Sequence, residues 1–355
     1  MAFISQTQPE VLESAYQELE DDFVRFLGLE SLDQMISKNP GCIEKFEAGL
    51  KESLYDAFSS GESCPEAHLF LHRILYRINR LKLFWYDELE NYANENSNYL
   101  FSLRLRIEKA WQQWEDLSSN SRNTDNTFKA LCDRTEEDLQ PEPSPDGLFI
   151  RNEITKFGYQ RLLGITSLDG LVEASQLSRM LGGVGNEVQS MLTRILWEEY
   201  GCGKFSRKHS THFATMLEEL DMDSTPEAYF EFVPWEVLAN INHSFFLSEN
   251  KKHFLRYVGG LLFIETSVPA AFENIKMAGE RLKLGDRGVS YWDIHIQEDI
   301  RHGQWMLDLV ALPLIEKYPK HAWDMIRGYD QQKFFSSRAS SAIVASIRHL
   351  ECSYK

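Results

Sequence analysis

The chain has 355 residues, which is enough for two domains, and 43% of them are hydrophobic, which is enough for a substantial core. Its 37 basic and 54 acidic residues give a formal net charge of −17. This balance argues against nucleic acid and anionic membranes as partners, because both bind basic surfaces.

The cysteines and the N-terminus define the expected compartment. The five cysteines are scattered and form no Cys-x-x-Cys pair, so neither a disulfide framework nor a zinc ribbon is predicted. The N-terminus has no basic region followed by an apolar stretch, and no apolar run is long enough to span a bilayer. We therefore expect a soluble, cytoplasmic protein.

Residues 1–140 are predicted to form a helical N-terminal domain. A first amphipathic helix is indicated by apolar residues spaced four, three, four and three apart: Leu12, Tyr16, Leu19, Phe23 and Phe26. Pro65 opens a second helix and residues 97–117 form a third. His68 and His72 share a face of the second helix, where packing or a surface position is a better explanation than metal binding. The aromatic-rich helices suit a homodimer, although burial against the second domain would explain them equally well.

A proline-rich breaker at residues 140–147 separates this region from a second domain, residues 141–355. Thr166 and Ser167 are plausible N-caps of the next helix, which is expected to carry Glu173 and to end at Gly182-Gly183.

In two further segments, an apolar helical stripe ends at a glutamate. A helix that starts near Asn186 leads to Glu199 and stops at Gly201, and His209 follows Glu199 by ten residues. The segment 253–265 ends on Glu265, and Pro269 is expected to close or kink this helix. A carboxylate at the end of such an apolar stripe must be paired or neutral.

The most informative helix is predicted at residues 289–312. His295, Asp299 and His302 stand at i, i+4 and i+7 and so share one face, which continues as Met306 and Leu309. Imidazole and carboxylate groups together suit iron, zinc or manganese.

Together these helices offer four carboxylates and three imidazoles, the ligand complement of a dinuclear, carboxylate-bridged iron or manganese site inside a helical bundle. For each residue alone, exposure at a helix end is an alternative. So is a partner among Arg179, Arg194, Arg256 and Arg301. The sequence lacks the Glu-x-x-His motifs of ferritin-like bundles, so an all-α bundle of another kind is predicted.

The motifs resemble those of the haem-oxygenase-like diiron oxidases and oxygenases, also described as iron-containing redox enzymes. The resemblance covers about residues 148–335. It rests on His-x3-Asp-x2-His at His295, Trp-Glu-Glu-x-Gly-x-Gly with a later His between Trp197 and His209, and Gly-x4-Glu-x3-Pro between Gly260 and Pro269. It implies metal ligation by Glu173, Glu199, His209, Glu265, His295, Asp299 and His302.

In layout the chain resembles the N-oxygenating members of the nitrosourea-forming type, in which Glu199 matches an additional carboxylate ligand. This implies an O2-dependent N-oxygenase of specialised biosynthesis, with two iron ions, an external electron donor and an amine or guanidine of a cationic amino acid as substrate. Those members carry a further C-terminal cupin domain, so the rearrangement to an N-nitroso product is not expected here.

Two alternatives remain at this point. Other members of the family use such a site for desaturation or C–C cleavage of amino acids or fatty acids. The chain could also be a metal-free binding protein of haem-oxygenase-like fold, with its carboxylates paired to arginines. The sequence does not distinguish iron from manganese.

Overall fold

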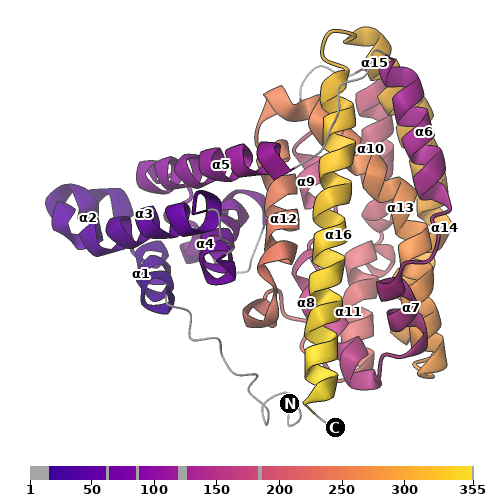
Figure 1. The fold of residues 1–355 in the computed structure, drawn as a ribbon, viewed down its shortest axis with the longest axis horizontal. Helices are drawn as coiled ribbons and strands as arrows, with labels where there is room; N and C mark the ends of the chain where they lie inside the picture. Colours follow the sequence, from indigo (N-terminus) through magenta and orange to yellow (C-terminus); the bar gives the residue numbers. More distant parts are fainter. Residues whose placement is uncertain (1–15, 61–63, 85–87, 119–125, 183–185, 354–355) are drawn as a thin grey trace. The chain divides into compact units, whose positions relative to one another are not determined.

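The computed structural model describes residues 16–60, 64–84, 88–118, 126–182 and 186–353 (Figure 1). Within these ranges every regular element is a helix, so the predicted all-α class is confirmed. The chain divides into two compact units, Met1–Asn120 and Ser121–Lys355. In the described part of the chain, no helix combines the length and apolar character needed to cross a lipid bilayer.

The described residues of the first unit form five α-helices and two short 3-10 turns. Their bounds are α1 (Gln17–Leu27), α2 (Leu32–Lys38), η1 (Pro40–Ile43), α3 (Glu44–Phe58), α4 (Pro65–Leu83), η2 (Leu89–Tyr92) and α5 (Asn98–Ser118). The periodic residues from Tyr16 to Phe26 are buried as predicted, while Leu12 lies outside the described residues. The helices expected at Pro65 and at residue 97 begin within one residue of those positions. Self-association of this unit stays a prediction.

His68 and His72 pack inside the first unit against aromatic rings. The ring of His72 meets Trp111 edge-on with centroids 4.9 Å apart, and that of His68 lies 5.3 Å from Trp114. No potential metal-binding group of the described residues includes either histidine. Packing therefore explains this pair, as the sequence suggested.

The second unit is a bundle in which α13 packs along both α14 and α16 (Figure 1). Its α-helices are α6 (Thr127–Leu139), α7 (Pro145–Asn152), α8 (Lys156–Gly170), α9 (Ser175–Ser178), α10 (Glu187–Glu199), α11 (His209–Glu219), α12 (Trp235–Ser248), α13 (Phe254–Arg281), α14 (Ser290–Trp305), α15 (Leu312–Lys317) and α16 (Trp323–Cys352). The shorter turns are η3 (Gly201–Gly203), η4 (Phe205–Arg207), η5 (Phe230–Phe232), η6 (Lys251–His253), η7 (Arg287–Val289) and the π-helical η8 (Met306–Ala311).

Helix α6 belongs to the second unit, although the sequence placed it before a domain boundary at residue 140. Its Arg134 forms an ion pair with Asp330 of α16, with Nε and Oδ1 2.7 Å apart, and its Asp138 accepts a hydrogen bond from the hydroxyl of Tyr329 at 2.9 Å. The units divide between residues 120 and 121 because these contacts join α6 to α16. The proline-rich breaker is instead the short connection from α6 to α7.

Glu173 does not lie on a helix, contrary to the expectation from the sequence. The hydroxyls of Thr166 and Ser167 donate to the carbonyls of Leu162 and Gly164 inside α8, so neither residue is an N-cap. Helix α8 ends at Gly170, and a turn in which Ala174 has φ 61° carries Glu173 to α9. The expected helix end at Gly182-Gly183 lies partly outside the described residues.

Pro269 was expected to close or kink its helix, and the helix of residues 289–312 was predicted to end at residue 312, but both segments continue as helix past a proline. Helix α13 continues through Pro269 to Arg281. Pro313 lies in the first turn of α15, directly after the π-helical turn η8. A wider turn before Pro313 relieves the clash of its ring with the preceding carbonyls. This turn also changes the register of the helix, so Leu309 is exposed rather than on the buried stripe.

Candidate metal centre

All seven predicted ligands lie in the second unit and converge on one cluster. Glu173 comes from the turn after α8, Glu199 from the last turn of α10, His209 from the start of α11 and Glu265 from the middle of α13, while His295, Asp299 and His302 come from one face of α14. Six of them are buried, and Glu173 keeps 20% of its side chain exposed.

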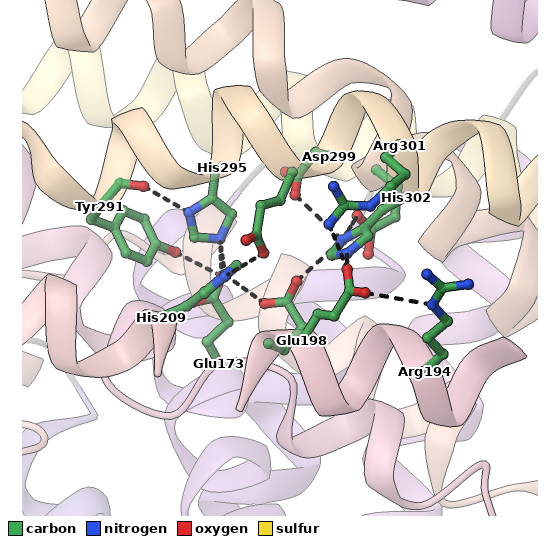
Figure 2. Close-up of polar contacts among 12 residues, drawn as sticks. Glu173, Arg194, Glu198, His209, Tyr291, His295, Asp299, Arg301 and His302 are labelled. Atoms are coloured by element: carbon green, nitrogen blue, oxygen red, sulfur yellow. Dashed lines mark hydrogen bonds and ion pairs between the residues drawn. The ribbon is translucent and has the colours of Figure 1, made fainter. Parts of the chain in front are cut away.

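The first half of the cluster joins two histidines and two glutamates (Figure 2). Nε2 of His295 lies 2.8 Å from Oε1 of Glu173 and 3.1 Å from Nδ1 of His209. The same Nδ1 lies 2.8 Å from Oε2 of Glu199. One ligand atom from each of the four residues falls within 4.8 Å of the others, a spacing that one metal ion could span.

The second half is centred on Nδ1 of His302. This atom lies 3.3 Å from Oε1 of Glu199, 3.4 Å from Oε2 of Glu265 and 3.6 Å from Oδ1 of Asp299. Glu199 therefore belongs to both halves and directs one carboxylate oxygen to each. If two metal ions were bound, Glu199 could therefore contribute a ligand to each of them.

The turn after α10 returns the chain from Glu199 to His209. Gly201 has φ +64°, a left-handed conformation that favours glycine. A Cβ atom added to Gly201 would lie 2.5 Å from the backbone nitrogen of Lys208, so only glycine permits this approach. His209 follows directly and faces back onto Glu199.

The carboxylates strongly attract positive charge. Burial lowers the pKa of His302 and of His209, but contacts with Glu199 outweigh it and raise both values to about 11. Burial also opposes protonation of His295, whose pKa is still raised to about 9 by Glu173 and Asp299. Among these buried groups, burial raises the pKa of Asp299 well above its usual range.

Glu265 and Glu199 respond differently to burial. Burial raises the pKa of Glu265, and its contact with His302 only partly opposes this. Burial also acts to raise the pKa of Glu199, but the charge and hydrogen bond of His209 prevail and lower it. The charged form is therefore favoured more strongly at Glu199, the shared carboxylate, than at Glu265.

The donor set fits a pair of divalent metal ions. Within the described residues, no lysine or arginine forms an ion pair with Glu173, Glu199, Glu265 or Asp299. Three buried atoms of the cluster also lack a hydrogen-bond partner there: Oε2 of Glu173, Oδ1 of Asp299 and Nδ1 of His302. Four carboxylates would balance the four positive charges of two ferrous ions, and buried charges need such compensation.

The arginines considered as partners from the sequence lie elsewhere. Arg179 pairs with Glu249, Arg194 and Arg301 contact Glu198, and Nε of Arg256 donates to Gln331. The structure therefore does not support the ion-paired, metal-free alternative.

Tyr291 anchors the first half of the cluster from both its backbone and its side chain (Figure 2). Its carbonyl oxygen lies 2.7 Å from Nδ1 of His295, so this nitrogen carries the proton and Nε2 faces the cluster. Its hydroxyl donates to Oε1 of Glu173 at 2.8 Å. These contacts fix the orientation of two ligands.

Sequence reasoning missed two glutamates that contact the cluster. Glu198 reaches Nε2 of His302, and Glu298 reaches Nε2 of His209. Each directly precedes a predicted ligand in the chain. The available signal was the adjacency of two acidic residues at Glu198-Glu199 and at Glu298-Asp299.

Comparisons with known proteins show which family this region resembles. Residues 160–331, which include all seven predicted ligands, match the family of iron-containing redox enzymes of haem-oxygenase-like fold. The chain is also similar to the nitrosourea synthase of Streptomyces achromogenes subsp. streptozoticus, with 31% identity over 153 residues. That alignment covers 42% of this chain but only 32% of the synthase, so the chain matches about a third of its relative.

Proposed function

We propose that this chain, whose residues 160–331 belong to the family of iron-containing redox enzymes, is an O2-dependent non-haem diiron N-oxygenase. Its substrate would be an amine or guanidine nitrogen of a basic amino-acid-type molecule. The observation that carries the proposal is the position of Glu199, one oxygen of which faces His209 and the other His302. A carboxylate shared in this way supports a site for two ions.

The roles of the side chains follow from their chemistry. His209, His295 and His302 would serve as neutral nitrogen ligands, and the four carboxylates would balance the charge of the ions. When bound, ferrous iron would supply the electrons that activate O2, and an external donor would replace them. Six of the seven candidate ligands are buried, which would limit the access of water to the reaction.

The choice of nitrogen as the oxidised atom is supported by the relative. A nitrosourea contains an oxidised nitrogen, and the synthase of that name shares 31% of the aligned residues with this chain. Glu199 adds a carboxylate to the site, as expected for the N-oxygenating type. We therefore favour oxidation of nitrogen over desaturation or C–C cleavage.

A cationic substrate is supported by the charge around the site. Asp169 lies four residues before Glu173 at the end of α8, and its side chain is accessible to solvent. No lysine or arginine of the described chain forms an ion pair with it. We infer that Asp169 would bind the charged end of the substrate, while the reacting nitrogen must lose its proton.

The proposal is tested by loading the protein anaerobically with ferrous iron and then adding O2, a reductant and a panel of arginine and lysine derivatives. We expect two iron ions per chain and a product that gains one or more oxygen atoms on nitrogen, detected by mass spectrometry. Loss of two hydrogens without oxygen gain would favour desaturation. Absence of bound iron would overturn the proposal, and the H302A variant is the matched negative control.

A further inference from the structure

Two glutamates outside the predicted ligand set contact the outer nitrogens of ligand histidines. Oε2 of Glu198 lies 3.0 Å from Nε2 of His302 (Figure 2), and Oε2 of Glu298 lies 3.2 Å from Nε2 of His209. The Nδ1 atoms of both histidines face the cluster. His295 has the reverse arrangement, with Nε2 inside and its Nδ1 on the Tyr291 carbonyl.

Helix geometry explains why the two residues of each adjacent acidic pair make different contacts. Successive residues of a helix point about 100° apart, so two adjacent acidic residues cannot face the same direction. At the end of α10, Glu199 faces the cluster and Glu198 faces the outer edge of His302. On α14, Asp299 faces the cluster and Glu298 faces the outer edge of His209. The inner member of each pair is a ligand candidate, and the outer member contacts a histidine.

Glu198 is itself held in place by two arginines. Nη2 of Arg301 lies 2.6 Å from its Oε2, and Nε of Arg194 lies 3.5 Å from its Oε1. Both guanidinium groups stack on the ring of Trp305, at 4.0 Å for Arg194 and 5.1 Å for Arg301. Only 15% of the Glu198 side chain is exposed. The two arginines therefore hold in place the carboxylate that contacts His302.

A third metal ion in this outer region is a weaker explanation. Glu198, Glu298 and Nε2 of His302 do lie within 4.8 Å of one another and could hold a cation. However, Arg301 and Arg194 already neutralise Glu198, and a metal ion beside them would be repelled. Ligand histidines in proteins usually donate their second ring N–H to a carboxylate or carbonyl, and that is the geometry present here.

We propose that Glu198 and Glu298 are positioning residues for the metal centre. Each accepts the Nε2–H of its histidine, which leaves the lone pair of Nδ1 directed at the cluster and makes the imidazole more basic. This inference rests on the proposed metal site. Outer carboxylates of this kind change metal affinity by about 10–100-fold when they are replaced.

The test compares E198Q and E298Q with E187Q, which replaces an exposed glutamate at the start of α10. Metal affinity is measured with Co²⁺ and Fe²⁺ against a chromophoric chelator, and the absorption spectrum of bound Co²⁺ reports the ligand geometry. We expect E198Q and E298Q to bind about 10–100-fold more weakly with altered Co²⁺ spectra. E187Q should match the unsubstituted protein, and thermal unfolding without added metal shows whether the variants fold.

A second measurement addresses the ring nitrogens directly. In the Zn²⁺-bound protein, ¹⁵N spectra of histidine should show the proton on Nε2 of His209 and His302 and on Nδ1 of His295. Coordination of His209 and His302 through Nε2 would overturn the inference, as would E198Q and E298Q variants with unchanged affinity. If the unsubstituted protein binds no metal, the proposed function fails instead, so the two failures are distinguishable.

Discussion

The backbone carbonyl of Glu265 lies against Gly303, at the point where α13 meets α14. Pro269 has no N–H, so it cannot donate to the carbonyl of Glu265 four residues earlier. A Cβ atom added to Gly303 would lie 3.0 Å from that carbonyl oxygen. Pro269 and Gly303 together therefore bring a ligand-bearing segment of α13 close to the helix that carries three further ligands.

We predict that G303A weakens metal binding by separating these helices. The new methyl group meets backbone atoms, which cannot rotate away, and overpacking of this kind typically costs about 1–3 kcal/mol. Metal affinity and the unfolding temperature should both fall. The control is G182A, because a Cβ atom at Gly182 meets nothing within 4 Å. Equal effects of the two substitutions would show that the close approach at Gly303 is unimportant.

Removing the shared carboxylate should affect both halves of the centre. In E199A, His209 and His302 lose the oxygens that lie 2.8 and 3.3 Å from their Nδ1 atoms. We expect the iron content, measured by plasma mass spectrometry after anaerobic loading, to fall from two ions per chain to one or fewer. A variant that retains two tightly bound ions would show that Glu199 is not shared.

Asp169 should govern affinity for a cationic substrate rather than the rate of the chemistry. Loss of a hydrogen bond or ion pair to a charged group typically costs about 1.5–3 kcal/mol, so D169N should raise KM by about 10–100-fold with little change in kcat. A neutral isostere of the same substrate should lose much less affinity. An equal loss for charged and neutral substrates would argue against a role in charge recognition.

The acid stability of the second unit should depend on His243. Burial, followed by the charges of Arg256, Arg327 and His253, lowers the pKa of His243 well below 6.5. Below about pH 6.5 the unfolded chain therefore binds a proton that the folded chain excludes, and stability falls as the pH falls. Each such proton contributes at most about 1.4 kcal/mol per pH unit.

The H243F variant tests this dependence. Its aromatic ring can keep the packing against Phe335, whose ring centroid is 4.7 Å from that of His243. Between pH 7.5 and 5.5 its denaturation midpoint should fall less than that of the unsubstituted protein. His253, whose pKa burial and Arg256 lower to about 4, should still contribute to the remaining slope. Identical pH dependence of the two proteins would exclude His243 as the cause.

Periodicity predicted the parts of the site that lie on regular helices. His295, Asp299 and His302 share a face because their spacing determines it, and Glu199 ends a stripe in which Leu192 and Ile195 are buried. The turn at Gly201 was also readable, since glycine marks a helix end. Periodicity does not show that these helices come together; that prediction came from their combined set of carboxylates and imidazoles and from the family resemblance.

The remaining features depend on conformations that local sequence does not specify. Glu173 lies in a turn in which Ala174 adopts a left-handed conformation, and alanine gives no sign of this. The π-helical turn before Pro313 is likewise not indicated by the local sequence, and it places Leu309 at the surface. Glu198 and Glu298 were missed because each has an acidic neighbour, and the sequence alone does not show what each residue of such a pair contacts in the folded protein.

The central claim is that two metal ions share Glu199, and anomalous diffraction at the iron edge tests it most directly. Crystals loaded anaerobically with ferrous iron should show two peaks, one beside Glu173, His209 and His295 and the other beside Glu265, Asp299 and His302, with Glu199 in contact with both. A single peak, or none at this cluster, would contradict the account.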